Sequence, residues 1–126
     1  LAVLDAREID YRDAALPTVL RAWLSAGVTG VVAFNDDVAG TIVGTAVRAG
    51  IGVPADLAVV GHDNTPVASY FAPTISSVGL DSVGFGRWMA EQALHLAEGR
   101  PATTGFPEPT AYLIERESSG PARLGK

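Results

Sequence analysis

The sequence contains no cysteine, and its only lysine is Lys126. The absence of cysteine excludes disulfides and thiolate chemistry and fits a cytoplasmic protein. No apolar run approaches the roughly 18 residues of a membrane span, and no charged-then-apolar secretory signal opens the chain. We therefore expect a cytoplasmic protein that does not enter a membrane.

Positive charge is also scarce. The chain has 9 Lys and Arg against 14 Asp and Glu, a net charge of −5, and its arginines are scattered singly. Binding a nucleic-acid backbone requires a clustered positive face that releases counterions. We therefore expect that this chain does not bind DNA by itself.

Motifs of catalysis are missing as well. The chain has no Gly-rich phosphate loop, no Cys nucleophile and no Ser elbow. Three acidic residues at predicted strand ends, Asp36, Asp37 and Asp63, resemble the acidic cup of a magnesium-dependent phosphoryl-transfer or receiver domain. Such sites also need a cation to steady the phosphate, and no internal lysine is available. We expect no enzyme, no cofactor and no metal site.

What is present indicates one α/β domain. The chain has 126 residues, of which 48% are hydrophobic, enough for a single core. It begins with Leu1 on an apolar run, which suggests a fragment or a processed piece. Hydrophobic periodicity and the positions of Gly and Pro predict strands and helices in alternation, typical of a parallel sheet. The predicted strands cover 1–4, 31–34, 57–61, 74–78 and 111–116. The predicted helices run from about 13 or 17 to 26, from 37 to 49 and from 81 or 82 to 98. An irregular turn is expected over 65–71, and the end from 118 onward is expected to be loose.

Two polar turns follow neighbouring predicted strands. Asn35 and Asp36 come directly after the first, and His62-Asp63-Asn64 comes after the second. Ligands of open parallel sheets bind beyond the carboxyl ends of the strands, where a carboxylate accepts and an amide donates and accepts. Asp63 and Asn35 are therefore candidates to bind ligand hydroxyls. The simpler alternatives are that Asn35 or Asp36 caps a helix and that Asp63 only closes a turn.

The helix predicted over 37–49 has one broad apolar face and one face of small residues. Each glycine in a helix costs about 1 kcal/mol relative to alanine, so two of them one turn apart need a reason. Small residues permit close approach of a symmetry-related helix, and a solvent-facing helix is the alternative. The predicted dimer face consists of Gly40, Thr41, Gly44 and Thr45.

Several segments, in this order and at these spacings, resemble the repressors of the lactose and galactose type (the LacI/GalR family). They are 32–39, 48–57, 59–65, 73–78 and 113–118, and the resemblance from Val28 to Ser119 covers about three quarters of the chain. The resemblance implies a periplasmic-binding-protein-like fold of two α/β lobes around a ligand cleft, preceded by a helix-turn-helix headpiece. Residues 1–126 would be the C-terminal lobe, and the helix over 83–98 would pack on a first lobe that is absent, as is the headpiece.

The resemblance also implies site residues. Asp63 and the pair Asn35 and Asp36 correspond to ligand contacts of the family, with Asp36 able to serve either as contact or as cap. Tyr11 lies where the family often presents an aromatic ring to a sugar or base, although it can also be a surface tyrosine. His62 stands where the family often has Tyr or Phe, and either contacts the ligand or packs under the turn. Leu80 replaces a frequent Gln.

The function that follows is effector sensing and dimerisation in a transcriptional regulator that reaches DNA only through another domain. The effector would be a small sugar-like or nucleobase-like ligand. A sugar-binding protein of a transport system shares the fold and is the alternative, and the Val53–Asp56 turn and the Arg116–Ser118 ending favour the regulator.

The long helix near the end of the chain carries a stripe of large apolar residues. Trp88 and Met89 are most simply core residues, and His95 lies on the polar side of the helix. Without a first lobe the stripe would be exposed, and large apolar patches are rarely left so. We therefore expect it to fold onto its own lobe, pack on a neighbouring chain or swap between chains. The stripe consists of Phe85, Trp88, Met89 and Leu96.

Overall fold

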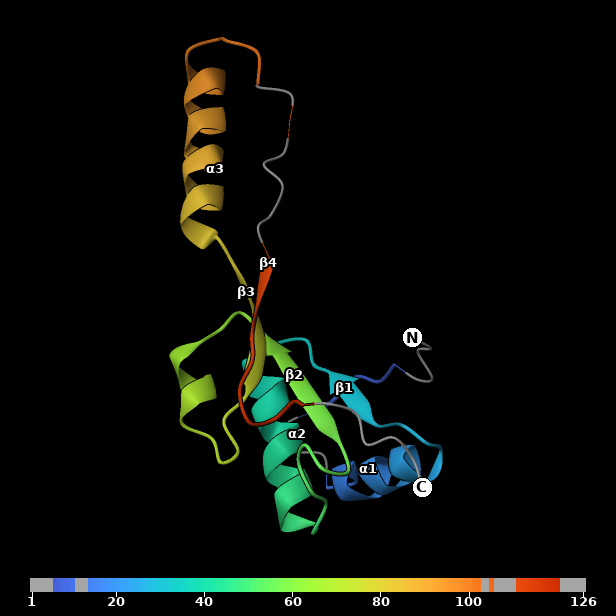
Figure 1. Cartoon of the computed structure of the whole chain (residues 1–126). Helices are drawn as coiled ribbons and strands as arrows, with labels where there is room; N and C mark the ends of the chain where they lie inside the picture. Colours follow the sequence, from blue (N-terminus) through green and yellow to red (C-terminus); the bar gives the residue numbers. More distant parts are fainter. Residues whose placement is uncertain (1–5, 11–13, 103–104, 106–110, 121–126) are drawn as a thin grey trace.

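The computed structural model describes residues 6–10, 14–102, 105 and 111–120. A four-stranded sheet with helices against it forms a body, and one long helix extends away from that body (Figure 1). The expected α/β class is confirmed. The helices are α1 (Leu16–Ser25), α2 (Asp36–Arg48) and α3 (Ser82–Ala97), with a short 3-10 helix η1 (Pro66–Ser69).

The sheet has the order β1-β2-β3-β4. Strands β1 (Gly30–Val32), β2 (Ala58–His62) and β3 (Ser76–Leu80) are parallel, and β4 (Ala111–Ile114) returns antiparallel to β3. In register, Val31 lies opposite Val59 and Gly61 lies opposite Ser77. The carboxyl ends of the three parallel strands therefore meet at one edge, from which α3 extends (Figure 1).

The core lies between α1, α2 and the sheet. Both helices turn apolar stripes toward it, as their helical spacing predicts. The largest apolar side chains that are fully buried are Leu20, Ile42, Val43, Leu57, Val59 and Ile75. This set places one face of the sheet under the two helices and leaves the polar turns at its edge.

Several predicted boundaries are wrong. The first strand ends at Val32 rather than at Phe34, whose side chain is 86% exposed. The next two strands lie closer to the C-terminus, so that β2 includes His62 and β3 ends at Leu80. Apolar runs indicate where strands lie but not where they end, because a strand ends where its ladder of hydrogen bonds to the partner strand ends.

The segment after β4 is fixed, and the expectation that it is loose from Ser118 onward is wrong for the described part. Ser118 is fully buried. Its Oγ donates to the Val59 carbonyl (2.6 Å) and accepts from the Ser76 N–H (2.8 Å), while its own N–H donates to the Thr74 carbonyl (2.9 Å). Residues 116–118 thus join the ends of β2 and β3.

The small face of α2 differs from the expectation at two positions. Gly40 and Thr45 are buried, and a Cβ placed on Gly40 would lie 2.2 Å from the Phe71 ring. Gly40 is therefore small because Phe71 of its own chain covers it. Thr41 and Gly44 remain half-buried.

Helix α3, which we call the arm, contributes nothing to the core. None of its residues is buried; Met89 is 53% exposed and Leu96 is 67% exposed. The Phe85 and Trp88 rings stack on each other at 6.1 Å, and the Trp88 N–H donates to the Gly105 carbonyl (3.1 Å). The prediction that Trp88 and Met89 are core residues is wrong for this chain. Of the three arrangements expected for the stripe, folding onto its own lobe is not the one that the structure has, and packing on a neighbouring chain or a swap between chains stays a prediction.

Candidate ligand-binding site

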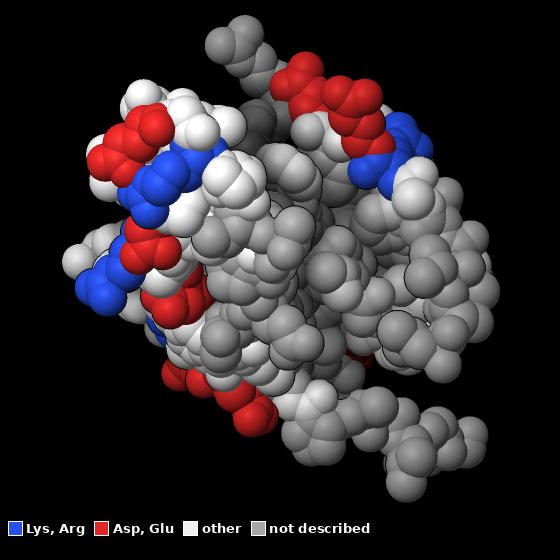
Figure 2. Space-filling model, turned by 90° about the horizontal axis from the view of Figure 1, so that it is seen from above, with Lys and Arg blue, Asp and Glu red and all other residues white. Residues whose placement is uncertain are grey.

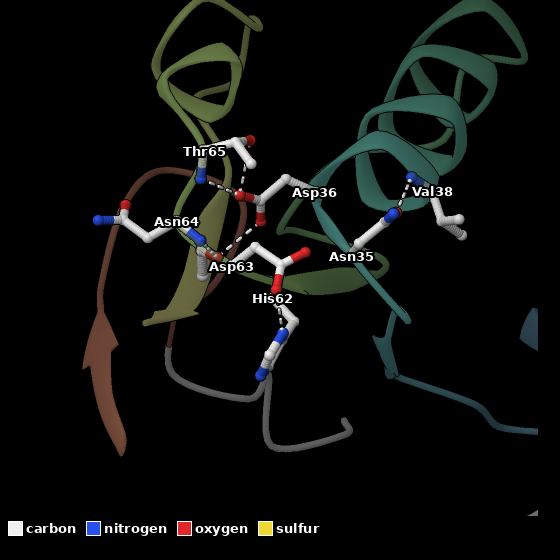
Figure 3. Close-up of polar contacts among 8 residues, drawn as sticks. Asn35, Asp36, Val38, His62, Asp63, Asn64 and Thr65 are labelled. Carbon is white, nitrogen blue, oxygen red and sulfur yellow. Dashed lines mark hydrogen bonds and ion pairs between the residues drawn. The ribbon is translucent and has the colours of Figure 1, made fainter. Parts of the chain in front are cut away.

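Polar residues gather at the edge where β1 and β2 end. Asn35 precedes α2 as its N-cap, His62 is the last residue of β2, and Asp63 and Asn64 form the turn after it (Figure 3). Because β1 and β2 are parallel neighbours, the two turns lie side by side. This is the position at which open α/β sheets bind ligands.

Asn35 is the N-cap of α2. Its Oδ1 accepts a hydrogen bond from the Val38 N–H at 2.9 Å, which satisfies one free amide of the first turn. The capping prediction for Asn35 is confirmed. The Nδ2 donor of the same side chain is outside this bond, so the cap and a ligand contact do not exclude each other.

Asp63 carries the exposed charge of the site. Its side chain is 52% exposed, and its Oδ1 lies 2.7 Å from Nδ1 of His62. The imidazole thus orients one carboxylate oxygen and leaves the other directed to partners outside the pair. His62 is itself half-exposed, so it lies beside the Asp63 carboxylate rather than under the turn.

The turn has an unusual backbone. Asp63 and Asn64 both have positive φ, 89° and 49°, which is rare for residues other than glycine. Hydrogen bonds to β3 hold it: the Asp63 N–H donates to the Val78 carbonyl (2.9 Å) and the Asn64 N–H donates to Ser77 Oγ (3.0 Å). The result directs Asp63 outward from the sheet edge.

Asp36 lies beneath this turn and is fully buried. Its Oδ1 accepts from Ser77 Oγ (2.6 Å), and its Oδ2 accepts from the Thr65 N–H (2.6 Å) and Oγ1 (3.0 Å). Figure 3 shows its carboxylate directed at Thr65. Asp36 does not cap α2, because Asn35 supplies that cap, and both of its carboxylate oxygens accept hydrogen bonds from other residues of the chain.

Arg116 is part of the site although its sequence position did not indicate it. Its guanidinium donates through Nη2 to Asn64 Oδ1 (2.7 Å) and through Nη1 to the Ile75 carbonyl (2.6 Å). It lies 52 residues from Asn64 in the chain, so no local spacing connects the two. In the sequence Arg116 stands out only as part of the 113–118 segment that resembles the LacI/GalR family, and that segment does not indicate a contact with Asn64.

Other candidate residues fall elsewhere. Tyr11 lies outside the described residues. Among the residues that the structure describes, no group of three His, Asp or Glu could hold a metal ion. In the same part of the chain, no helix is both long and apolar enough to cross a membrane.

In the view of Figure 2, acidic and basic side chains lie near one another, and the described residues form no continuous basic surface on that face.

Comparison with known proteins gives the context of the site. The family model of the periplasmic binding protein-like domain matches residues 3–119. The transcriptional regulator GntR of Pseudomonas aeruginosa is 34% identical over 92 residues, which are 73% of this chain and 27% of that protein. The regulator GalR of Escherichia coli is 34% identical over 92 residues, 71% of this chain and 26% of that protein. The chain thus spans about a quarter of the length of these relatives.

Solved structures agree with the sequence relatives. A LacI family transcriptional regulator from Arthrobacter sp. FB24, in complex with lactose, is 30% identical with a TM-score of 0.67, over 84% of this chain and 40% of that chain. Transcription regulator CcpA of Lactococcus lactis, at 20% identity, shares the fold with a TM-score of 0.75 over 90% of this chain and 41% of its own. The chain belongs to the periplasmic binding protein-like domain family, and its relatives there are transcriptional regulators of the LacI/GalR type.

Proposed function

We propose that this chain is the effector-sensing part of a transcriptional regulator and binds a small polyhydroxylated ligand. The observation that carries the proposal is the exposed Asp63 carboxylate, oriented by His62 at the carboxyl edge of the sheet beside Asn35. A carboxylate accepts from two neighbouring hydroxyls and an amide donates as well as accepts, which suits a sugar. Asp36 is left out of the proposed contacts because it is buried.

The ligand class follows from the same edge. No metal or phosphate chemistry is supported by the described residues there, whereas vicinal hydroxyls match Asp63 and the free donor of Asn35. The lactose complex of the Arthrobacter regulator, at 30% identity, makes lactose the first probe. Tyr11 remains a proposed aromatic contact, and His62 a proposed neighbour of the ligand. Catalysis is not part of the proposal.

DNA is proposed to be bound by another part of the protein. With a net charge of −5 the chain lacks the positive face that a phosphate backbone requires. The relatives named above are regulators rather than transport proteins, which favours sensing over uptake. A regulator of this kind works where the chromosome is, so we place it in the cytoplasm.

Residues 1–126 are proposed to form the C-terminal lobe of a two-lobed sensor. The arm exposes Phe85, Met89 and Leu96 on a helix with no buried residue. Burying a large apolar side chain that is now in water would gain about 1.5–3 kcal/mol of free energy. We therefore propose that the arm packs on the first lobe of the same protein.

The first test is Asp63→Ala in the full-length protein. Loss of a hydrogen bond to a charged group costs about 1.5–3 kcal/mol, so the affinity for lactose, or for the sugar that binds in a wider panel, should fall by one to two decades. Isothermal titration measures the affinity, and circular dichroism should show the fold unchanged. Asp37→Ala, which removes an exposed carboxylate from the first turn of α2, is the matched control and should bind as the wild type does.

Two results would count against the proposal. Unchanged affinity in Asp63→Ala would make Asp63 a turn residue only. If no sugar in a panel of mono- and disaccharides binds the wild type, a polyhydroxylated ligand is the wrong class, and nucleobases become the next candidates.

A two-fold dimer through α2 is also proposed. Gly40 and Thr45 are buried within the chain, so Thr41 and Gly44 would supply the accessible small surface. Gly44→Arg should turn the dimer into a monomer in sedimentation, because an isologous contact meets the new side chain twice. Gly44→Ala is the control: its Cβ would meet only the end of the Arg48 side chain at 3.2 Å, so the dimer should persist. A dimer that survives Gly44→Arg would refute this contact.

A further inference from the structure

The backbone conformation of the turn that presents Asp63 is stabilised by contacts with other parts of the chain. Two successive non-glycine residues with positive φ are each disfavoured, and such conformations persist only where the surroundings fix them. Three amides of the turn donate to fixed acceptors: Asp63 to the Val78 carbonyl, Asn64 to Ser77 Oγ and Thr65 to the buried Asp36 carboxylate. All three of these acceptors belong to β3 or α2.

The fourth support comes from the other side of the turn. Arg116 binds the Asn64 side chain through Nη2 of its guanidinium and the Ile75 carbonyl through Nη1. The planar guanidinium donates in two fixed directions at once, which a lysine ammonium does not. Arg116 therefore fixes the distance between the ligand turn and the segment that leads into β3.

The backbone of Arg116 is anchored as well. Its N–H donates to Ser76 Oγ (2.7 Å), and the same hydroxyl donates to the Arg116 carbonyl (3.1 Å). Arg116 lies two residues after the end of β4, the strand that pairs with β3. The backbone of Arg116 is therefore fixed to Ser76, the first residue of β3.

We infer that Arg116 is a positioning residue of the ligand site: through Asn64 it holds Asp63 in its binding orientation. This inference rests on the proposed function of Asp63 as a ligand contact. Arg116 itself is not assigned a contact with the ligand.

The first experiment needs no ligand. Hydrogen exchange of the amides of residues 63–65 is measured in the full-length protein for the wild type, Arg116→Gln and Glu117→Gln. Arg116→Gln should raise the exchange rate of these amides about tenfold, because a hydrogen bond to a charged group is lost, while the amides of α2 keep their protection. Glu117→Gln is the matched control: Glu117 accepts from Thr74, not from the turn, and the turn should exchange as in the wild type.

Conservative variants separate positioning from general stability. Arg116→Lys keeps the charge but not the two-directional donor, and should fall between wild type and Arg116→Gln. Asn64→Ala removes the same bond from the other end and leaves the contact with Ile75 intact, so it serves if Arg116→Gln does not fold. Turn amides as protected in both Arg116→Gln and Asn64→Ala as in the wild type would overturn the inference.

The second experiment measures affinity for lactose, or for the panel sugar that binds. Arg116→Gln should weaken binding about tenfold. Adding Asn64→Ala to Arg116→Gln should weaken it little further, because the bond between these two side chains is already lost in Arg116→Gln. Additive losses would overturn the action through Asn64. If the wild type binds no sugar, the proposed function fails while the exchange experiment still decides whether Arg116 holds the turn.

Discussion

The body of this chain and its arm use the same kinds of apolar residue with opposite results. In the body, side chains such as Leu20, Ile42 and Leu57 are buried among α1, α2 and the sheet. In the arm, Phe85, Met89 and Leu96 recur at helical spacing and yet remain exposed. An amphipathic pattern therefore predicts that a helix has a face to be covered, and does not say which part of the protein covers it.

The hydrogen bonds of the body and of the arm also differ, in how far apart in the sequence the bonded residues lie. The body ties distant segments together through buried groups, as Asp36 does with Ser77 and Ser118 does with Val59. In the arm, the N-cap bond runs within three residues, from the Gly84 N–H to Asp81 Oδ1 at 2.9 Å. The arm is thus a locally specified helix, whereas the body depends on contacts across the whole chain.

The largest expected effect comes from truncating one leucine in each region. Leu57→Ala, at a fully buried position, should lower the free energy of unfolding by about 2–5 kcal/mol, through lost transfer free energy and a cavity. Leu96→Ala, at a position 67% exposed, should change it by less than about 0.5 kcal/mol. Urea unfolding of the 126-residue chain, followed by circular dichroism at low concentration, measures both.

The same pair of variants can break the comparison. A cost for Leu96→Ala equal to that for Leu57→Ala would mean that the arm is packed in solution. If the cost for Leu96→Ala grows with protein concentration, a second copy covers the arm, as in a swapped or paired assembly. The fluorescence of Trp88 over the same concentrations gives an independent readout of that burial.

Local chemistry made part of the site predictable. Asn35 before an apolar helical pattern predicts an N-cap, and the structure has that bond. An acidic turn after a buried strand predicts a polar edge, and Asp63 lies there with its carboxylate exposed. Each of these features depends on residues within a few positions of one another, so the sequence contains the whole argument.

The supports of the turn could not be predicted in that way. The bond between Asp36 and Ser77 joins residues 41 apart, and that between Arg116 and Asn64 joins residues 52 apart. Such pairs form only once the strand order and register are set. The burial of Gly40 beneath Phe71 has the same origin, because a small residue on a helix does not reveal whether its own chain or another one covers it.

The smallest expected effect concerns Glu117, in the segment that follows β4. Glu117 Oε2 accepts from the Thr74 N–H (2.8 Å) and from Thr74 Oγ1 (3.0 Å), and these two bonds lower the pKa of Glu117 from its usual 4.5. A carboxylate with a lowered pKa in the folded state stabilises that state when ionised. The contribution is therefore complete above pH 4.5 and is lost as the pH falls from there through the folded-state pKa.

Glu117→Gln isolates this contribution, because the amide does not titrate and keeps an oxygen acceptor. The urea midpoint of the wild type should exceed that of Glu117→Gln at pH 7, and the difference should shrink steadily below pH 4.5 until the two midpoints meet. The other carboxyl groups titrate alike in both proteins, so the difference between the midpoints reports Glu117 alone. A difference that stays constant from pH 7 to pH 3 would show that Thr74 binds the side chain at residue 117 equally well with or without its charge. The attachment of residues 116–118 to β3 would then depend on the bonds of Ser118 and Arg116 rather than on the charge of Glu117.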